Sequence, residues 1–96
     1  VSLLLEPLED GRPVVLTSYD ILNTRNHERY DFTNSSQGLP EGQYVAISDA
    51  QLNDIDKKGT LLRLSGKKTD GQDYMLEFEV GHDCCHVIPL SGPFVD

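Results

Sequence analysis

The most concentrated chemistry of this chain lies in five consecutive residues, His82-Asp83-Cys84-Cys85-His86. Imidazole nitrogens and thiolates are the ligands that zinc and copper prefer in proteins. If the segment is an extended strand, His82, Cys84 and His86 share one face, because strand side chains alternate between the two faces. Residues two apart on a strand lie about 7 Å apart, so such side chains can share one ion. The segment therefore predicts a zinc or copper site made by His82, Cys84 and His86.

Other interpretations of the same segment stay open. Gly81-His82-Asp83 is typical of a turn, which would remove His82 from the strand face. Cysteine is among the most often buried residues, so buried structural cysteines beside a hydrogen-bonded histidine, with no cofactor, are the simpler interpretation. A cysteine nucleophile is disfavoured, since Asp83 and a net charge of −8 raise a thiol pKa. Adjacent cysteines could join each other only through a strained eight-membered ring.

A second candidate site is a surface for ligand contact. Tyr19 stands beside Asp20 and near Asn23, which combines an aromatic ring that could stack on a sugar with polar groups that could bind its hydroxyls. The other three tyrosines occupy alternating strand positions and are expected in the core. The sequence therefore predicts Tyr19, Asp20 and Asn23 as ligand-binding residues, with Tyr19 exposed.

Composition and charge exclude several classes of function. The 96 residues allow one domain, residues 1–96, and 16 acidic against 8 basic residues repel the phosphates of nucleic acid and of acidic membranes. No apolar run approaches the roughly 18 residues of a membrane-spanning helix. The acidic residues follow no calcium-binding loop, no glycosidase pair is evident, and no glycine-rich loop could hold a phosphate. We therefore expect a protein that is not an enzyme, does not bind nucleic acid and does not span a membrane.

Alternating hydrophobicity and closely spaced turns predict the elements that position these residues. Short apolar or β-branched segments bounded by turn residues indicate about seven strands, at residues 2–8, 14–19, 29–32, 43–48, 60–64, 73–80 and 84–90. Residues 20–28 are expected to form a loop. Residues 49–58 predict one short helix, capped by Ser48 or Asp49 and closed by Gly59. The fold class that follows is all-β, an antiparallel β-sandwich, although a small barrel would give the same local pattern.

Two segments resemble motifs of the carboxypeptidase-regulatory-like, prealbumin-type β-sandwich domains. Gly11-Arg12-Pro13-Val14 is similar to the G-x-P-V turn that follows their first strand. Tyr30-Asp31-Phe32 and then Leu39-Pro40-Glu41-Gly42-Gln43-Tyr44 are similar to their aromatic-x-aromatic and L-P-x-G-x-Y motifs. The resemblance covers residues 2–48, and Leu16-Thr17-Ser18-Tyr19 departs from the family's G-A-x-V. Residues 83–93 resemble small secreted bacterial lipoproteins.

This resemblance implies a non-catalytic, immunoglobulin-like accessory or binding module that contacts a protein or a glycan. It implies an extracytoplasmic location, secreted or anchored at the outer surface, with a larger cell-surface protein or assembly as partner. Because the chain begins with Val1 and not Met, we expect that a preceding segment was removed, with any targeting signal. The alternative is a small extracytoplasmic zinc- or copper-binding protein. Edge strands at residues 2–8 or 84–90 could also pair with another chain.

Overall fold

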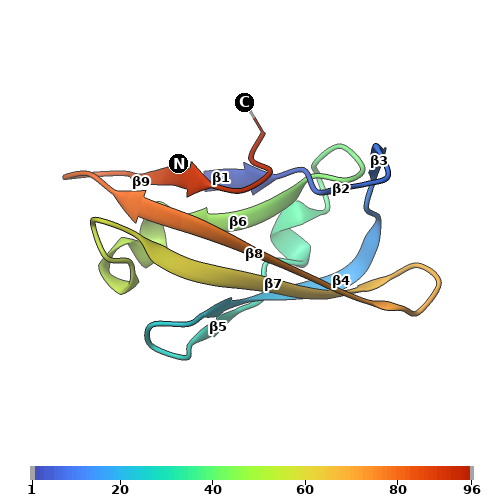
Figure 1. Cartoon of the computed structure of the whole chain (residues 1–96), viewed down its shortest axis with the longest axis horizontal. Helices are drawn as coiled ribbons and strands as arrows, with labels where there is room; N and C mark the ends of the chain where they lie inside the picture. The colour runs from blue at the N-terminus through green and yellow to red at the C-terminus, as the bar shows by residue number, and fades with distance from the viewer. Residues whose placement is uncertain (1, 96) are drawn as a thin grey trace.

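A five-stranded antiparallel sheet forms one layer of the fold (Figure 1). The computed structural model describes residues 2–95. The order across this sheet is β5-β4-β7-β8-β9, so three strands that follow one another along the chain, β7, β8 and β9, lie side by side. Their bounds are β4 Leu16–Asn23, β5 Arg29–Tyr30, β7 Thr60–Lys68, β8 Asp73–His82 and β9 Val87–Ser91.

The second layer is a smaller sheet that covers one face of the first. Strand β1 (Ser2–Leu5) pairs antiparallel with β6 (Tyr44–Ser48). The segment after β9 then lies along the other edge of β1, where the Val95 N–H donates to the Leu4 carbonyl at 2.9 Å. Leu5 and Phe94 form an antiparallel bridge in the same segment. The two layers make an antiparallel β-sandwich, which confirms the predicted all-β fold class.

Short elements connect the two layers. Strands β2 (Leu8–Glu9) and β3 (Arg12–Pro13) form a small ribbon, and η1 (Asn34–Ser36) is a single 3-10 turn. The predicted helix at residues 49–58 is a shorter 3-10 helix, η2 (Asp49–Asp54). Ser48 caps it as expected, because its hydroxyl accepts from the Ala50 N–H at 3.3 Å. The helix ends early because the backbone of Ile55 is extended, and the Ile55 side chain is buried in the core.

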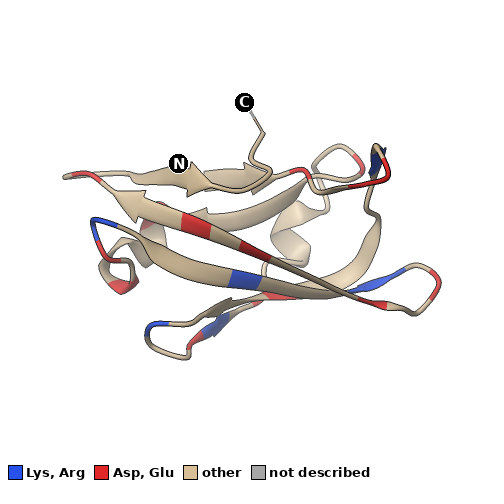
Figure 2. Ribbon diagram, viewed as in Figure 1, with Lys and Arg blue, Asp and Glu red and all other residues tan. Residues whose placement is uncertain are grey.

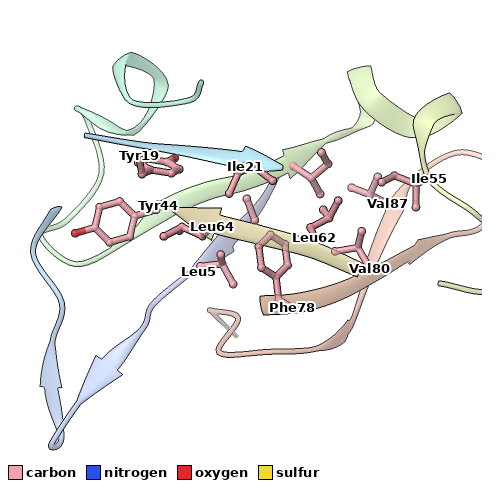
Figure 3. Close-up of a cluster of buried hydrophobic side chains, with 12 residues drawn as sticks. Leu5, Tyr19, Ile21, Tyr44, Ile55, Leu62, Leu64, Phe78, Val80 and Val87 are labelled. Carbon is pink, nitrogen blue, oxygen red and sulfur yellow. The ribbon is translucent and has the colours of Figure 1, made fainter. Parts of the chain in front are cut away.

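The core lies between the two layers and draws on nearly every strand (Figure 3). Tyr19 and Tyr44 lie together at one end of the core, and Ile55 and Val87 lie toward the other. Strand β8 shows the predicted alternation, since Phe78 and Val80 are buried whereas Glu77 and Glu79 are exposed. The same alternation in β7 buries Leu62 and Leu64, and the strands predicted at residues 60–64 and 73–80 pair with each other as an antiparallel hairpin.

Several predicted boundaries differ from those in the structure, and two of the differences affect the candidate sites. Strand β4 begins at Leu16 instead of residue 14 and continues to Asn23, so the first four residues of the predicted loop at 20–28 are strand. Burial of Ile21 and Asn23 against the second layer explains this extension. The last strand begins at Val87 and not at Cys84, because residues 83–86 form a turn.

Both strand edges that we expected to be open to another chain are covered or blocked. The edge of β1 is covered by the segment around Phe94. At β9, the Val87 N–H donates to the Asp49 carboxylate at 3.0 Å. This N–H points away from β8, so it cannot donate to a further strand at that edge. Strand N–H groups alternate in direction, and Pro89, two residues further, has no N–H to offer on that side. These features disfavour strand addition at the predicted edges.

Candidate functional site

The turn between β8 and β9, residues 83–86, carries two of the predicted metal ligands, Cys84 and His86, and the third, His82, is the last residue of β8. The Asp83 N–H donates to the His86 carbonyl at 3.0 Å, which closes the turn. The Asp83 carboxylate in turn accepts from the N–H groups of Cys85 and His86, both at 2.8 Å. Asp is favoured at the start of such turns because its short side chain can reach the backbone two and three residues ahead. These hydrogen bonds also hold the pKa of Asp83 below its usual range.

This turn changes both interpretations of the cysteines. His82, Cys84 and His86 do not share a strand face, because only His82 belongs to a strand. Within residues 2–95, no group of three or more His, Cys, Asp or Glu side chains is arranged to hold a metal ion. Cys84 and Cys85 are free and exposed, so the expectation of buried structural cysteines is wrong. A hairpin tip offers them no core to pack against.

The two histidines of the turn are held through their Nδ1 atoms. His82 Nδ1 lies 2.7 Å from the Asp83 carbonyl oxygen, and His86 Nδ1 lies 3.0 Å from Oδ2 of Asp49. Carbonyl and carboxylate oxygens only accept hydrogen bonds, so each Nδ1 is the donor. In the neutral ring the lone pair is then on Nε2, the atom that could bind a metal. The hydrogen bonds from His86 and from the Val87 N–H also hold the pKa of Asp49 well below its usual range.

The thiols are in an anionic environment. The side-chain contact with Cys84, partial desolvation, and the nearby Asp83 and Asp49 carboxylates together raise the pKa of Cys85. A raised thiol pKa keeps Cys85 protonated at neutral pH, and the protonated thiol is a weak nucleophile. The turn therefore presents two exposed thiols beside His86, and Cys85 is not an activated cysteine.

The predicted ligand-binding residues Tyr19, Asp20 and Asn23 do not form one surface. They are neighbours on β4, so Tyr19 and Asn23 face the core whereas Asp20 faces solvent, where it pairs with Arg29 at 3.0 Å. Tyr19 is only 5% exposed, and Asn23 is fully buried. The prediction that Tyr19 is an exposed stacking platform is therefore wrong. Its hydroxyl instead donates to the Val45 carbonyl at 2.7 Å and lies 2.6 Å from Ser36 Oγ.

Burial of Tyr19 gives the protein a testable dependence on alkaline pH. Desolvation raises the pKa of Tyr19 to about 12, although the hydrogen bonds with Ser36 and Val45 act in the opposite direction. Between pH 10 and 12 the unfolded chain loses this proton before the folded protein does, so the free energy of unfolding falls as pH rises. We expect this fall to be smaller in Tyr19→Phe than in the wild type, measured by urea denaturation at pH 8, 10 and 11. An equal fall in both proteins would contradict it.

A surface that the sequence did not single out lies on the solvent side of the five-stranded sheet. We call it the outer face, meaning the side chains of β4, β7 and β8 that point away from β1 and β6. The strand register shows which residues of β4, β7 and β8 lie opposite one another on this face. Its central members are Asp20, Leu22, Leu61, Arg63, Ser65, Met75 and Glu77. The signal was present in the sequence, because the alternation in residues 73–80 placed Met75 on the solvent side.

The outer face combines exposed apolar groups with ion pairs. Leu61 is 42% exposed and Met75 is 63% exposed. Between them in the register, Arg63 Nη2 pairs with Glu77 Oε2 at 2.9 Å. Figure 2 shows these charges as acidic residues along β8 next to a basic residue of β7. The face is therefore amphipathic, because exposed apolar side chains lie beside acidic and basic ones.

At one end of the outer face lies a shallow polar hollow of about 320 Å³. Carboxylates and hydroxyls from β4, β7, β8 and the loop after β5 line it, including Ser18, Asp20, Asp31 and Ser65. Lys67 also lines the hollow, where its ammonium group pairs with the Asp73 carboxylate at 2.6 Å. The hollow holds no unpaired cluster of one charge, so it is a continuation of the outer face.

No family model, curated protein or solved structure matches the chain. Within residues 2–95, no helix has the length and apolar character needed to cross a membrane. The resemblance to prealbumin-type domains thus stays a prediction, and the geometry of the outer face and of the β8–β9 turn supports the proposals below.

Proposed function

We propose that the protein is a non-catalytic accessory module, secreted or tethered at the outer surface, that contacts a larger cell-surface protein or assembly through its outer face. The observation that carries this proposal is the exposure of Leu61 and Met75 beside the Arg63–Glu77 pair. Methionine and arginine are enriched where proteins contact one another, and apolar groups ringed by polar ones are typical of the centre of an interface.

A protein partner has more support than a glycan. Sugar rings are bound by stacking on exposed aromatic side chains, and among residues 2–95 every tyrosine and phenylalanine is buried or half-buried. Binding by strand addition is also disfavoured, because the edge of β9 is blocked and the edge of β1 is covered. We therefore place the contact with a partner on the outer face of the five-stranded sheet.

The proposal is tested by charging the outer face. In a double variant, Leu61→Lys with Met75→Lys, both substitutions lie at exposed positions, so folding should be retained. Binding to the component that co-purifies with the native protein is measured by surface plasmon resonance, and the Kd is expected to rise at least about 30-fold, the loss typical of an interface hot spot.

The matched control is Leu8→Lys on the β2–β3 ribbon, where the leucine is 57% exposed but lies outside the outer face. We expect its Kd to stay within about 2-fold of the wild type, as for a residue outside an interface. Equal Kd values for the wild type and the double variant would overturn the outer-face proposal. Selective binding to an immobilised glycan, lost in the double variant, would overturn the choice of a protein partner.

A further inference from the structure

We propose that Cys84 and Cys85 form a two-coordinate site for monovalent copper at the tip of the β8–β9 hairpin. This site is independent of the outer face. In Figure 1 the β8–β9 turn lies at one end of the long axis of the molecule, and the β7–β8 turn lies at the other.

Hydrogen bonds order the backbone of the turn that carries the two thiols. Cys84 and Cys85 are the central residues of a turn closed by the hydrogen bond from the Asp83 N–H to the His86 carbonyl. Two further hydrogen bonds tie the Asp83 carboxylate to the backbone after Cys84. Both cysteines are exposed, so an ion reaches them without any opening of the fold. Less ordering is then required on binding, which favours affinity.

Adjacent thiols suit a bridging ion better than a disulfide. A disulfide needs its sulfur atoms about 2.05 Å apart, which closes a strained ring between neighbouring residues. A metal with bonds to sulfur of about 2.3 Å lets the two sulfur atoms stay as far as about 4.6 Å apart. Binding one metal ion therefore requires less distortion of the peptide between Cys84 and Cys85 than forming a disulfide does.

Two histidines flank the thiol pair in the sequence, His82 at the end of β8 and His86 in the turn, and hydrogen bonds orient both rings. His86 donates its Nδ1–H to the Asp49 carboxylate, and His82 donates to a backbone carbonyl. Metal-binding histidines are typically held in this way, with the second nitrogen engaged by a carboxylate or a carbonyl. The tautomer of each ring is thus set, but within residues 2–95 no three such side chains are arranged around one point, so neither histidine is counted as a ligand of the two-coordinate site.

Monovalent copper fits this donor set better than zinc. Zinc sites in proteins use three or four side chains in a tetrahedral arrangement, and residues 2–95 offer no group of three. Soft thiolates select Cu(I), and two of them satisfy its preference for low coordination. On binding, each thiol loses its proton to solvent and one Cu–S bond forms to each sulfur, so two protons are released and no group changes oxidation state.

The test is an anaerobic titration of the whole chain with Cu(I) against the chromophoric chelator bicinchoninate. We expect one Cu(I) per chain, with X-ray absorption at the copper edge showing two sulfur neighbours. Cys84→Ser and Cys85→Ser should each weaken binding at least 100-fold. His86→Gln, which keeps both thiols, should weaken it by 10-fold or less.

Folding does not confound these variants, because the cysteines are exposed, and urea denaturation checks that each variant matches the wild type. The proposal is overturned if a variant with both cysteines replaced binds Cu(I) as tightly as the wild type. It is equally overturned by a first shell of nitrogen alone, or by zinc that competes with Cu(I) at equal concentration.

Discussion

Replacing Tyr19 by alanine is expected to lower the free energy of unfolding by about 3–5 kcal/mol, the cost typical of removing a buried aromatic side chain. The ring is 5% exposed and makes an edge contact with Tyr44, with ring centres 5.3 Å apart. Its hydroxyl joins β4 to β6 through the Val45 carbonyl and to η1 through Ser36. One substitution therefore removes core packing and a connection between the two layers.

Two further variants separate the contributions of the ring and the hydroxyl. Tyr19→Phe keeps the ring and leaves the Val45 carbonyl without its partner, which should cost about 1–2 kcal/mol. Tyr74→Ala removes a tyrosine that is only half-buried and should cost less than Tyr19→Ala. Urea denaturation of the three variants and the wild type measures these differences. If Tyr19→Ala cost no more than Tyr74→Ala, Tyr19 would not be the core residue described above.

The sequence could not predict the burial of Tyr19 because the cause is distant along the chain. Tyr19 lies opposite Gly66 across the β4–β7 pair, and a Cβ at Gly66 would lie 3.0 Å from the Tyr19 Cβ and 2.8 Å from the Ser18 carbonyl oxygen. Glycine at this position thus lets the two strands approach closely beside the ring. The polar residues next to Tyr19 in the sequence indicated an exposed site. Its burial depends instead on the pairing with Gly66, which is 47 positions away.

Where the deciding interactions are local, prediction from the sequence was better. The β7–β8 hairpin follows from alternation within two adjacent segments, and Ser48 caps η2 through neighbours in the sequence. The strand predicted to begin at Cys84 failed for a local reason. Residues 84–86 have a strand-like composition, but the Asp83 carboxylate accepts hydrogen bonds from the N–H groups of Cys85 and His86 and so forms a turn. The contact of His86 with Asp49, which fixes the imidazole, spans 37 positions and has no local signal.

Asn23, the other predicted ligand residue that proves to be buried, carries the second large expected effect. Its side-chain amide donates to the Asp54 carbonyl at 3.0 Å and to the Tyr30 hydroxyl at 3.3 Å, and its oxygen accepts from the Arg25 N–H at 2.9 Å. The side chain thus ties the end of β4 to β5 and to the end of η2. Asn23→Leu keeps a similar volume but leaves buried polar groups unpaired, so we expect a loss of about 2–3 kcal/mol in the free energy of unfolding.

The matched control is Asn26→Leu, three residues further in the same turn region. Asn26 is only half-buried; its side chain accepts from the Glu28 N–H at 2.9 Å and also contacts the Tyr30 hydroxyl, and the Glu28 N–H can hydrogen-bond to water when the amide is removed. A loss of no more than about 0.5–1 kcal/mol is therefore expected for the control. Because η2 carries Asp49, loosening its connection to Asn23 should also speed amide exchange at Val87, whose N–H that carboxylate accepts. Unchanged exchange at Val87 in Asn23→Leu would show that the anchoring of η2 and the order of the β8–β9 turn are independent.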